Sequence, residues 1–291
     1  MRIRETVILA VTALLALASC TKGLGVAPVG PLEMRLAPSL ADGQTKASLT
    51  TEDLYAFWLK VDCPTDPTYS YYERITKTET GWKASRPLFW KNETTPVTYC
   101  AAFVNGYNFT EWDFSNSVSH LEVLVDQSTL EYFLKSDLLI LEPSSIDYES
   151  TTDGALPITL KHGLSRVRFV LSLGNSYYDN GIGLTDNPVS NLKLYGIKLG
   201  YVYTPGTGEV VGKVSLSHFP RVLPLLISYT PGTASDKTST AVFEAILPPQ
   251  VCEPGSISVS FSIGPTDFEW INDRTITFNQ DKTLVLPISL N

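Results

Sequence analysis

The 291-residue sequence has little cysteine or histidine, and it contains only one long apolar run. Its four cysteines and three histidines do not stand with each other or with carboxylates at the spacing of a metal site. We therefore expect no metal and no other cofactor. The apolar run lies at the N-terminus, so no membrane-spanning helix is expected in the body of the chain. A solenoid is disfavoured because no fixed-period repeat is visible.

Positive charge is also scarce, with 22 lysines and arginines against 30 aspartates and glutamates and a formal net charge of −8. An acidic chain repels the phosphate backbone, so nucleic acid is not an expected partner. Catalytic groups are equally hard to find. The carboxylates Glu52 and Asp53 stand in turn-like sequence, and Ser165 near His162 lacks the Gly-x-Ser-x-Gly elbow of a serine hydrolase. We expect no enzyme, and a hydrolase is the least favoured alternative.

The apolar run Val7–Leu17 has the layout of an export signal. Two arginines precede it, and small residues and Cys20 follow it. This order is typical of a lipoprotein cleavage site, and it predicts removal of residues 1–19 and attachment of lipid (palmitate) to Cys20. The alternative is ordinary secretion, with Cys20 as a plain residue of the mature chain.

Three cysteines remain after Cys20, and an odd number cannot all pair. In an exported protein Cys63 and Cys100 could form a disulfide. The alternative, which we favour, is that Cys63, Cys100 and Cys252 are small buried apolar residues.

Strand-forming residues dominate over strong helix formers, which predicts an all-β fold. The polar segment Glu142–Gly154 predicts a domain boundary, with one β-sandwich at residues 47–150 and another at 151–291. A Ser-x-x-Glu pattern predicts one short helix at Ser128–Lys135. The strands expected in order are Leu54–Cys63, Tyr69–Lys77, Gly81–Trp90, Pro96–Val104, Leu121–Val125, Leu138–Leu141, Leu156–Leu173, Asn191–Tyr203, Glu209–Leu216, Leu223–Tyr229, Thr240–Leu247, Ser256–Ile263, Arg274–Phe278 and Thr283–Leu290.

Five tryptophans raise the question of a sugar-stacking platform, because aromatic faces suit pyranose rings. Trp82 and Trp90, on an expected hairpin near Tyr71 and Tyr72, are the candidates for a glycan contact. The alternative is that both rings pack in the core.

Both ends of the mature chain carry an alternating apolar stripe. The first, after a small-residue tether, is Leu32, Met34 and Leu36; the last is Leu284, Leu286, Ile288 and Leu290. Each stripe could complete its own sheet. However, a proteolytic cut after Lys46, in an exposed polar connection, or after Arg35 would remove the first strand and leave an apolar groove. A neighbour's terminal strand could then fill this groove as a donor strand.

Four short motifs together resemble the fimbrillin-like (Mfa-like) proteins of Bacteroidetes. They are the lipoprotein cysteine Cys20, Thr45-Lys46-Ala47-Ser48, Asp137-Leu138-Leu139, and Leu160-Lys161-His162-Gly163-Leu164-Ser165-Arg166-Val167. The resemblance covers the whole chain. It implies two transthyretin-like β-sandwich domains in tandem, export as an outer-membrane lipoprotein, and proteolytic maturation followed by strand-exchange polymerisation into fimbriae. In the best-known members the cut follows an arginine, whereas Lys46 holds the matching position here.

The favoured hypothesis is therefore a structural or adhesive subunit of a cell-surface fimbria. Residues 20–46 would form the tether and the removable first strand, and other fimbrial subunits would be the partners, with host or bacterial surface ligands as further ones. The alternative is a surface glycan-binding lipoprotein that does not polymerise.

Overall fold

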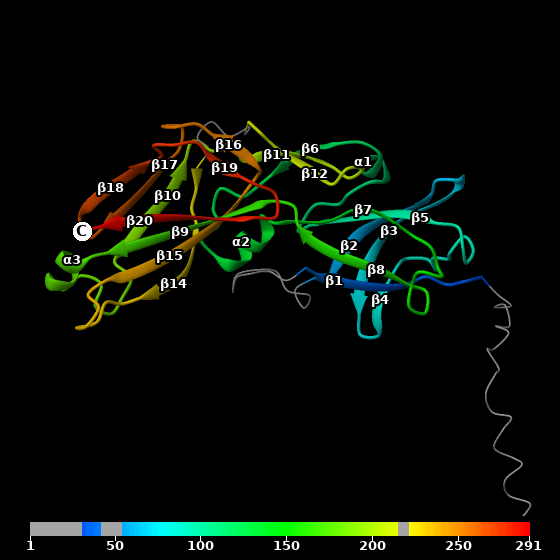
Figure 1. Ribbon diagram of the computed structural model, residues 1–291, viewed down its shortest axis with the longest axis horizontal. Helices are drawn as coiled ribbons and strands as arrows, with labels where there is room; N and C mark the ends of the chain where they lie inside the picture. Colours follow the sequence, from blue (N-terminus) through cyan, green and yellow to red (C-terminus); the bar gives the residue numbers. More distant parts are fainter. Residues whose placement is uncertain (1–30, 42–53, 215–220) are drawn as a thin grey trace, which may run out of the picture.

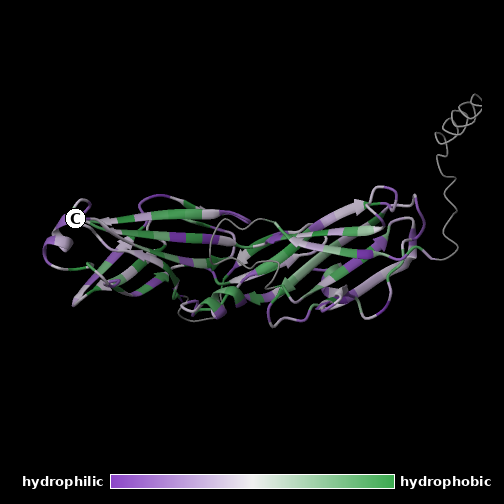
Figure 2. Ribbon diagram, turned by 90° about the horizontal axis from the view of Figure 1, so that it is seen from below, coloured by the Kyte–Doolittle hydropathy of each residue, from purple (hydrophilic) through white to green (hydrophobic). Residues whose placement is uncertain are grey.

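The regular structure of the described chain consists mainly of β-strands, as the computed structural model shows (Figure 1). The structure describes residues 31–41, 54–214 and 221–291. The all-β class predicted from the sequence is thus confirmed. Figures 1 and 2 show an elongated molecule with two β-rich halves arranged along its long axis. The C-terminus lies at one end, and the chain runs into the first strand from the other.

The first half is a curled seven-stranded sheet. Its strands, in spatial order, are β1 (Arg35–Leu40), β8 (Ala155–His162), β7 (Leu138–Ile146), β5 (Val97–Val104), β2 (Ala56–Cys63), β3 (Asp66–Thr78) and β4 (Gly81–Lys83). The alternation in β2 explains how this sheet forms a core, because Phe57, Leu59 and Val61 are fully buried on one face while Trp58 points to the other. Inside the curl, these residues meet Ile158 and Leu160 of β8.

The second half contains four smaller sheets. One is β13 (Arg221–Val222), β10 (Val189–Tyr195), β17 (Ser258–Ile263) and β18 (Thr266–Ile271); a second is β14 (Leu225–Thr230), β15 (Ser239–Leu247), β9 (Ser165–Leu173) and β20 (Thr283–Leu290). The others are β12 (Glu209–Lys213), β11 (Gly200–Thr204) and β6 (Val118–Glu122), and the pair β16 (Gln250–Cys252) and β19 (Ile276–Phe278).

The two halves share strands and core residues across residue 150. Strand β8 lies after the predicted boundary but belongs to the first sheet, whereas β6 lies before it and pairs with β11. Phe109 and Phe133, from the first part of the chain, pack in the same core as Phe169 and Tyr201. The boundary at 150 and the transthyretin-like form of the domains stay predictions.

Three short helices are present in the described part of the chain: α1 (Glu111–Ser115), α2 (Leu130–Lys135) and α3 (Asn175–Asp179). Only α2 was predicted, and its cap is Thr129 rather than Ser128, since the Thr129 hydroxyl accepts the bond from the Tyr132 amide at 3.3 Å. None of the described helices is long and apolar enough to cross a bilayer.

Several strand bounds were predicted wrongly; for example, the expected strand Gly81–Trp90 is only Gly81–Lys83 and Leu121–Val125 is Val118–Glu122. Two of the other differences have identifiable reasons. The segment Asn191–Tyr203 is two strands rather than one, because the chain turns at Gly196 with φ +76° beside the Ser256 carbonyl. Strand β7 runs on to Ile146, through Pro143 and into the segment where the domain boundary was predicted, because β5 offers it pairing partners as far as Val97.

Candidate functional site

The N-terminal strand is an edge strand that pairs in parallel with β8. Its register aligns Arg35 with Ala155 and Leu40 with Leu160. The prediction placed this strand at residues 32–36, which is wrong in its bounds: the strand spans Arg35–Leu40. Pro38 is tolerated inside it because an edge strand leaves one side of its backbone unpaired.

The residues just before β1 bond to a different segment. The Met34 amide donates to the Leu88 carbonyl at 2.8 Å, and the Trp90 amide donates to the Leu32 carbonyl at 2.8 Å. The stretch from Leu32 to Leu40 therefore connects two segments: its first residues bond to residues 88–90, and its last six pair with β8. Its apolar side chains face the first core, where Met34 is 5% exposed and Leu32, Leu36 and Leu40 are partly buried.

The carbonyl of Gly154 fixes the point where β1 begins. It accepts a hydrogen bond from the Arg35 amide at 3.1 Å and another from the Trp90 indole at 3.1 Å. Trp90 is 4% exposed and packs edge-on against Tyr148, with ring centroids 6.0 Å apart. Trp90 is thus a core residue that holds the strand, and its ring has no face free for a sugar.

Trp82 has a different environment. It is half-buried and packs at a tilt against Phe57, with ring centroids 5.4 Å apart. Together with residues 33–36 and 80–88 it lines a cleft of about 550 Å³ beside the first strand. A glycan contact therefore stays a prediction for Trp82, and it is no longer expected for the buried Trp90.

The C-terminal strand β20 completes its own sheet in this structure. It pairs in parallel with β9, from Thr283 opposite Arg166 to Leu290 opposite Leu173. Leu286 and Ile288 are buried, and Leu284 and Leu290 pack partly buried against the same core. The other side of β20 pairs with no strand of the described chain, so β20 is an edge strand.

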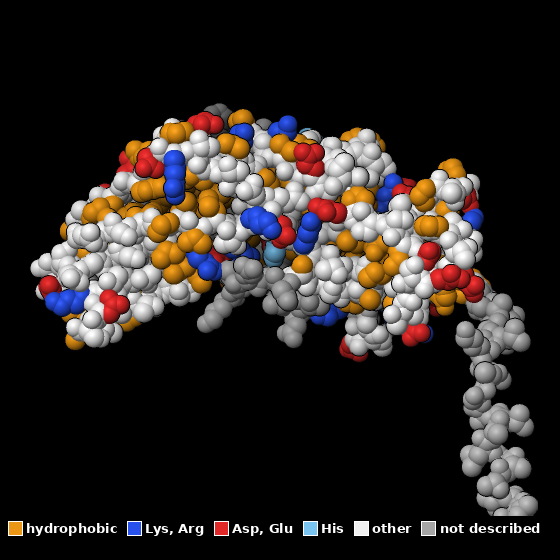
Figure 3. All heavy atoms as spheres, in the orientation of Figure 1, with side chains coloured by type: hydrophobic (Ala, Val, Ile, Leu, Met, Phe, Trp, Pro, Cys, Tyr) orange, Lys and Arg blue, Asp and Glu red, His pale blue; other side chains and the backbone are white. Residues whose placement is uncertain are grey.

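Charged groups gather between the two halves, where Figure 3 shows a histidine among acidic and basic side chains. His162 Nδ1 lies 2.6 Å from the Asp137 carboxylate, which is 2% exposed. The Asp137 charge raises the pKa of His162, although burial opposes the shift. Ser165 does not contact His162; its hydroxyl donates to the Lys282 carbonyl at 3.3 Å. Within the described residues, no serine, threonine or cysteine side chain is hydrogen-bonded to this His162–Asp137 pair.

The three cysteines in the described chain are free and buried, so Cys63 and Cys100 do not form a disulfide. Burial raises the pKa of the Cys100 thiol to about 12. This matches the favoured interpretation of small apolar residues. Within the described ranges, no three His, Cys, Asp or Glu side chains are grouped to hold a metal ion. Cys20 and Lys46 lie outside the described residues.

Comparison with known families identifies the chain. A sequence model described as fimbrillin-like matches residues 51–291. The chain belongs to the fimbrillin-like family. The family resemblance that its short motifs indicated is therefore confirmed.

Solved structures share the fold of this fimbrillin-like chain at low identity. A protein assigned to cell adhesion from Bacteroides ovatus is 11% identical, with a TM-score of 0.59 over 89% of this chain and 92% of its own. Another so assigned, from Bacteroides uniformis, is 13% identical, with a TM-score of 0.54 over 89% and 94%. A fimbrial protein from Bacteroides vulgatus is 12% identical, with a TM-score of 0.51 over 89% and 95%. A search of curated proteins finds no match.

Sequence reasoning missed the groups that hold the first strand. Gly154 and Leu88 are distant from β1 along the chain, and neither stands in a motif that signals pairing with it. The carbonyl of Gly154 becomes available because the residue adopts φ +72° in the turn before β8. A single sequence gives no local signal for such a contact.

Proposed function

We propose that this fimbrillin-like protein is a structural or adhesive subunit of a cell-surface fimbria, exported as a lipoprotein and assembled by proteolysis-triggered strand exchange. The observation that carries the proposal is the position of the first strand: β1 is an edge strand that covers part of an apolar core. Its removal would expose the core-facing side chains of β8 and the unpaired edge of its backbone.

The last strand has the properties of a replacement. Strand β1 has 6 residues and β20 has 8, and both pair in parallel with one neighbour at the edge of a sheet. A β20 strand from another copy could therefore add to β8 in the parallel direction it already has beside β9. The alternating residues Leu284, Leu286, Ile288 and Leu290 would supply the apolar stripe that Leu32, Met34 and Leu36 provide now.

The positions of the two strands favour growth along one axis. The chain enters β1 from one end of the elongated molecule, and β20 finishes at the other end (Figures 1 and 2). A donor strand at one end and an acceptor groove at the other form a head-to-tail contact. Such a contact does not close on itself and so generates a filament.

Of the two candidate cleavage sites, Lys46 suits the proposal better. A cut after Lys46 would release all of β1, together with Cys20 and its lipid. A cut after Arg35 would split the strand at its first residue and leave residues 36–40 paired with β8. The lipid would then act as a delivery anchor that is lost on assembly, and a subunit that escapes cleavage would remain attached to the outer membrane.

The test is to treat the purified chain with a trypsin-like protease. We expect mass spectrometry to show loss of the residues before Ala47, and size-exclusion chromatography and electron microscopy to show polymers. The matched control is Lys46→Gln, which should retain the first strand and stay monomeric. A chain that loses the segment completely and yet remains a monomer would count against polymerisation.

A second candidate, the surface glycan-binding lipoprotein that does not polymerise, is favoured by the cleft beside Trp82. This cleft has an aromatic wall, and it is formed partly by the first strand itself. It would therefore persist only in the uncleaved chain. Glycan binding that disappears with Trp82→Ala, in a chain that resists cleavage, would favour this function over assembly.

A further inference from the structure

A second cleft lies where β2 begins and β5 ends, and Trp58 and Arg74 line it from the face of the first sheet opposite the core. The side chains that alternate with the core residues of β2 point to this face, and the segment of residues 105–117, which contains α1, packs against part of it. Trp58 stacks on Tyr72 there, with ring centroids 5.1 Å apart and planes 5° apart. The Tyr72 hydroxyl in turn donates to the Phe109 carbonyl. These contacts fix the Trp58 ring and cover one of its faces, so only the other face is available to a ligand.

The cleft opens where the loop stops covering the sheet. It has a volume of about 160 Å³, and its walls come from the start of β2, from β3 and from the loop after β5. Tyr55 and Asn105 form its rim, since the tyrosine hydroxyl donates to the amide oxygen at 3.0 Å. Tyr55 also packs edge-on against Phe103, with ring centroids 5.2 Å apart. The rim is therefore formed before any ligand arrives.

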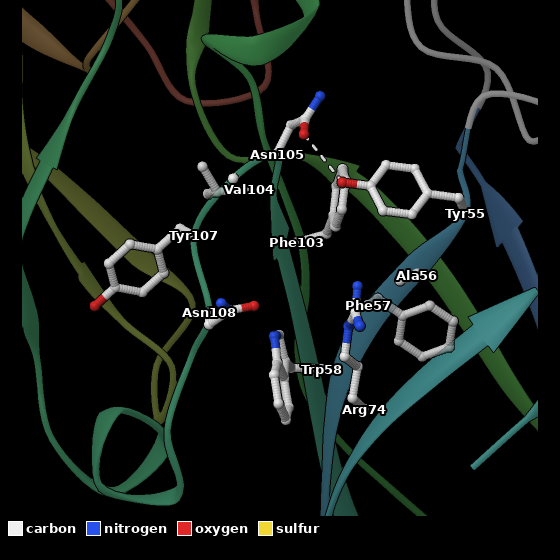
Figure 4. A pocket seen from close by; sticks show the side chains of 11 residues that line it. Tyr55, Ala56, Phe57, Trp58, Arg74, Phe103, Val104, Asn105, Tyr107 and Asn108 are labelled. Atoms are coloured by element: carbon white, nitrogen blue, oxygen red, sulfur yellow. Dashed lines mark hydrogen bonds between the residues drawn. The ribbon is translucent and has the colours of Figure 1, made fainter. Parts of the chain in front are cut away.

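Three polar side chains in this cleft have no hydrogen-bond partner in the described part of the chain: the Trp58 indole, the Arg74 guanidinium and the Asn108 amide. Arg74 is exposed and is the register partner of Trp58 across the β2–β3 pair, so both side chains rise from the same face. In the view of Figure 4, Arg74 and Asn108 lie on opposite sides of the Trp58 ring, and all three line the cleft. The cleft thus offers one aromatic face surrounded by unused donors.

This chemistry fits an acidic sugar. The aromatic face of Trp58 suits the apolar face of a pyranose ring, and amide and indole N–H groups suit its hydroxyls. An arginine guanidinium binds a carboxylate through two parallel hydrogen bonds. The protein has an overall charge of −8, so anions are attracted only by local groups such as Arg74.

The form of the cleft disfavours an extended peptide. Strand β2 pairs with β3 on one side and β5 on the other, so no free edge is available here for a peptide to add as a strand. The volume is close to the roughly 150 Å³ of a cavity that accepts one benzene-sized ring. We propose that this cleft binds the terminal ring of an acidic saccharide, with its carboxylate on Arg74 and its apolar face against Trp58.

This inference rests on the adhesive part of the proposed function and names a ligand class for it. The two can fail separately, because binding is measured on the uncleaved monomer. A chain that polymerises without binding acidic sugars would retain the assembly proposal and overturn this one. A chain that binds acidic sugars without polymerising would retain this proposal and overturn the assembly proposal.

The experiment compares two ligands that differ only at one carbon, methyl β-glucuronide and methyl β-glucoside, by saturation-transfer NMR and titration of the uncleaved chain. The methyl glycoside of N-acetylneuraminic acid serves as a second acidic probe. We expect an acidic glycoside to bind at least about tenfold more tightly than the neutral one, since a bidentate ionic contact contributes a factor of this size. A short peptide with a free carboxylate tests whether Arg74 prefers a peptide carboxylate to that of a sugar.

Two arginine variants assign the site. Arg74→Gln should weaken binding of the acidic sugar about tenfold or more and leave the neutral sugar unchanged, whereas Arg74→Lys should retain part of the binding. Arg221→Gln, which removes the same charge from the exposed first residue of β13, is the matched control and should bind like the wild type. Equal binding of acidic and neutral sugars, absence of binding to both acidic sugars, unchanged binding in Arg74→Gln, or a preference for the peptide would each overturn the proposal.

Discussion

Gln127 and Ile246 exchange two hydrogen bonds between the two halves of the molecule. The side-chain oxygen of Gln127 accepts from the Ile246 amide at 2.8 Å, and its nitrogen donates to the Ile246 carbonyl at 2.9 Å. Gln127 is fully buried, and its amide pairs with β15 as a strand residue would. The loop before α2 is thereby attached to the second half.

Replacing this glutamine should destabilise the protein. Gln127→Leu leaves both the amide and the carbonyl of Ile246 buried without a partner, which we expect to cost about 2–4 kcal/mol of unfolding free energy. Denaturant titration measures the loss. The control is Glu79→Leu at an exposed turn, which should change the free energy by no more than about 0.5 kcal/mol. Equal losses of unfolding free energy in both variants would show that the two buried hydrogen bonds of Gln127 do not stabilise the protein.

The ion pair of His162 with Asp137 should make stability depend on pH. Because the pKa of His162 is raised in the folded protein, the pair stabilises fully below the ordinary histidine value and loses its effect as pH rises through the raised value. Arg166 opposes the shift and Asp281 supports it, but Asp137 contributes the largest effect. We expect His162→Gln to be more destabilising at about pH 6 than at about pH 9.

Denaturant unfolding at the two pH values checks this prediction. His120→Gln is the matched control, since His120 is exposed and its side chain hydrogen-bonds only to its neighbour Ser119 within the described residues. Asp137→Asn should remove the extra effect of the His162 change. A loss in His162→Gln that is the same at both pH values would mean that the charge of the imidazole is not involved.

The Trp90 indole should control how easily the first strand opens. Trp90→Phe keeps the core ring but removes the bond to the Gly154 carbonyl, which leaves that carbonyl bonded only to the Arg35 amide. Loss of about 1 kcal/mol would raise the population of the opened strand roughly fivefold. Trypsin cleavage at Arg35 should accelerate by the same factor.

Trp82→Phe is the control for this experiment, because no hydrogen bond of the Trp82 indole exists in the described structure. Its cleavage rate should match that of the wild type. An equal acceleration in both variants would indicate general loosening of the first core, and no change in either would show that the Gly154 contact does not hold the strand.

Strands with strict alternation could be predicted from the sequence. The predicted bounds of β20 are those observed, and β5 differs by one residue at its start. Strand β18 was missed because its apolar stripe is short: only Phe268 and Trp270, both partly buried, alternate with the exposed polar residues. Partners could not be predicted, because the residues that bond to Leu32 and Met34 are separated from them by more than fifty positions and show no local pattern.

The same limit applies to the candidate sites. Trp90 resembles a surface aromatic in its local sequence, and its burial follows from the Gly154 carbonyl 64 residues away. The cleft with Trp58, Arg74 and Asn108 brings together three separate segments, which only sheet pairing places side by side. Apolar periodicity reports which face of a strand is buried, but it does not report what covers the other face.

The central claim is that β20 leaves its own sheet to fill a groove in the next molecule. An engineered disulfide that holds β20 in its own sheet until it is reduced tests this claim most directly. Ser172 and Ser289 are register partners on β9 and β20, and neighbouring strands bring such pairs within disulfide reach. A double variant, Ser172→Cys with Ser289→Cys, should stay monomeric after complete cleavage at Lys46 when oxidised, and it should form polymers when a reductant is added. Polymers that form equally well in the oxidised variant would contradict the account.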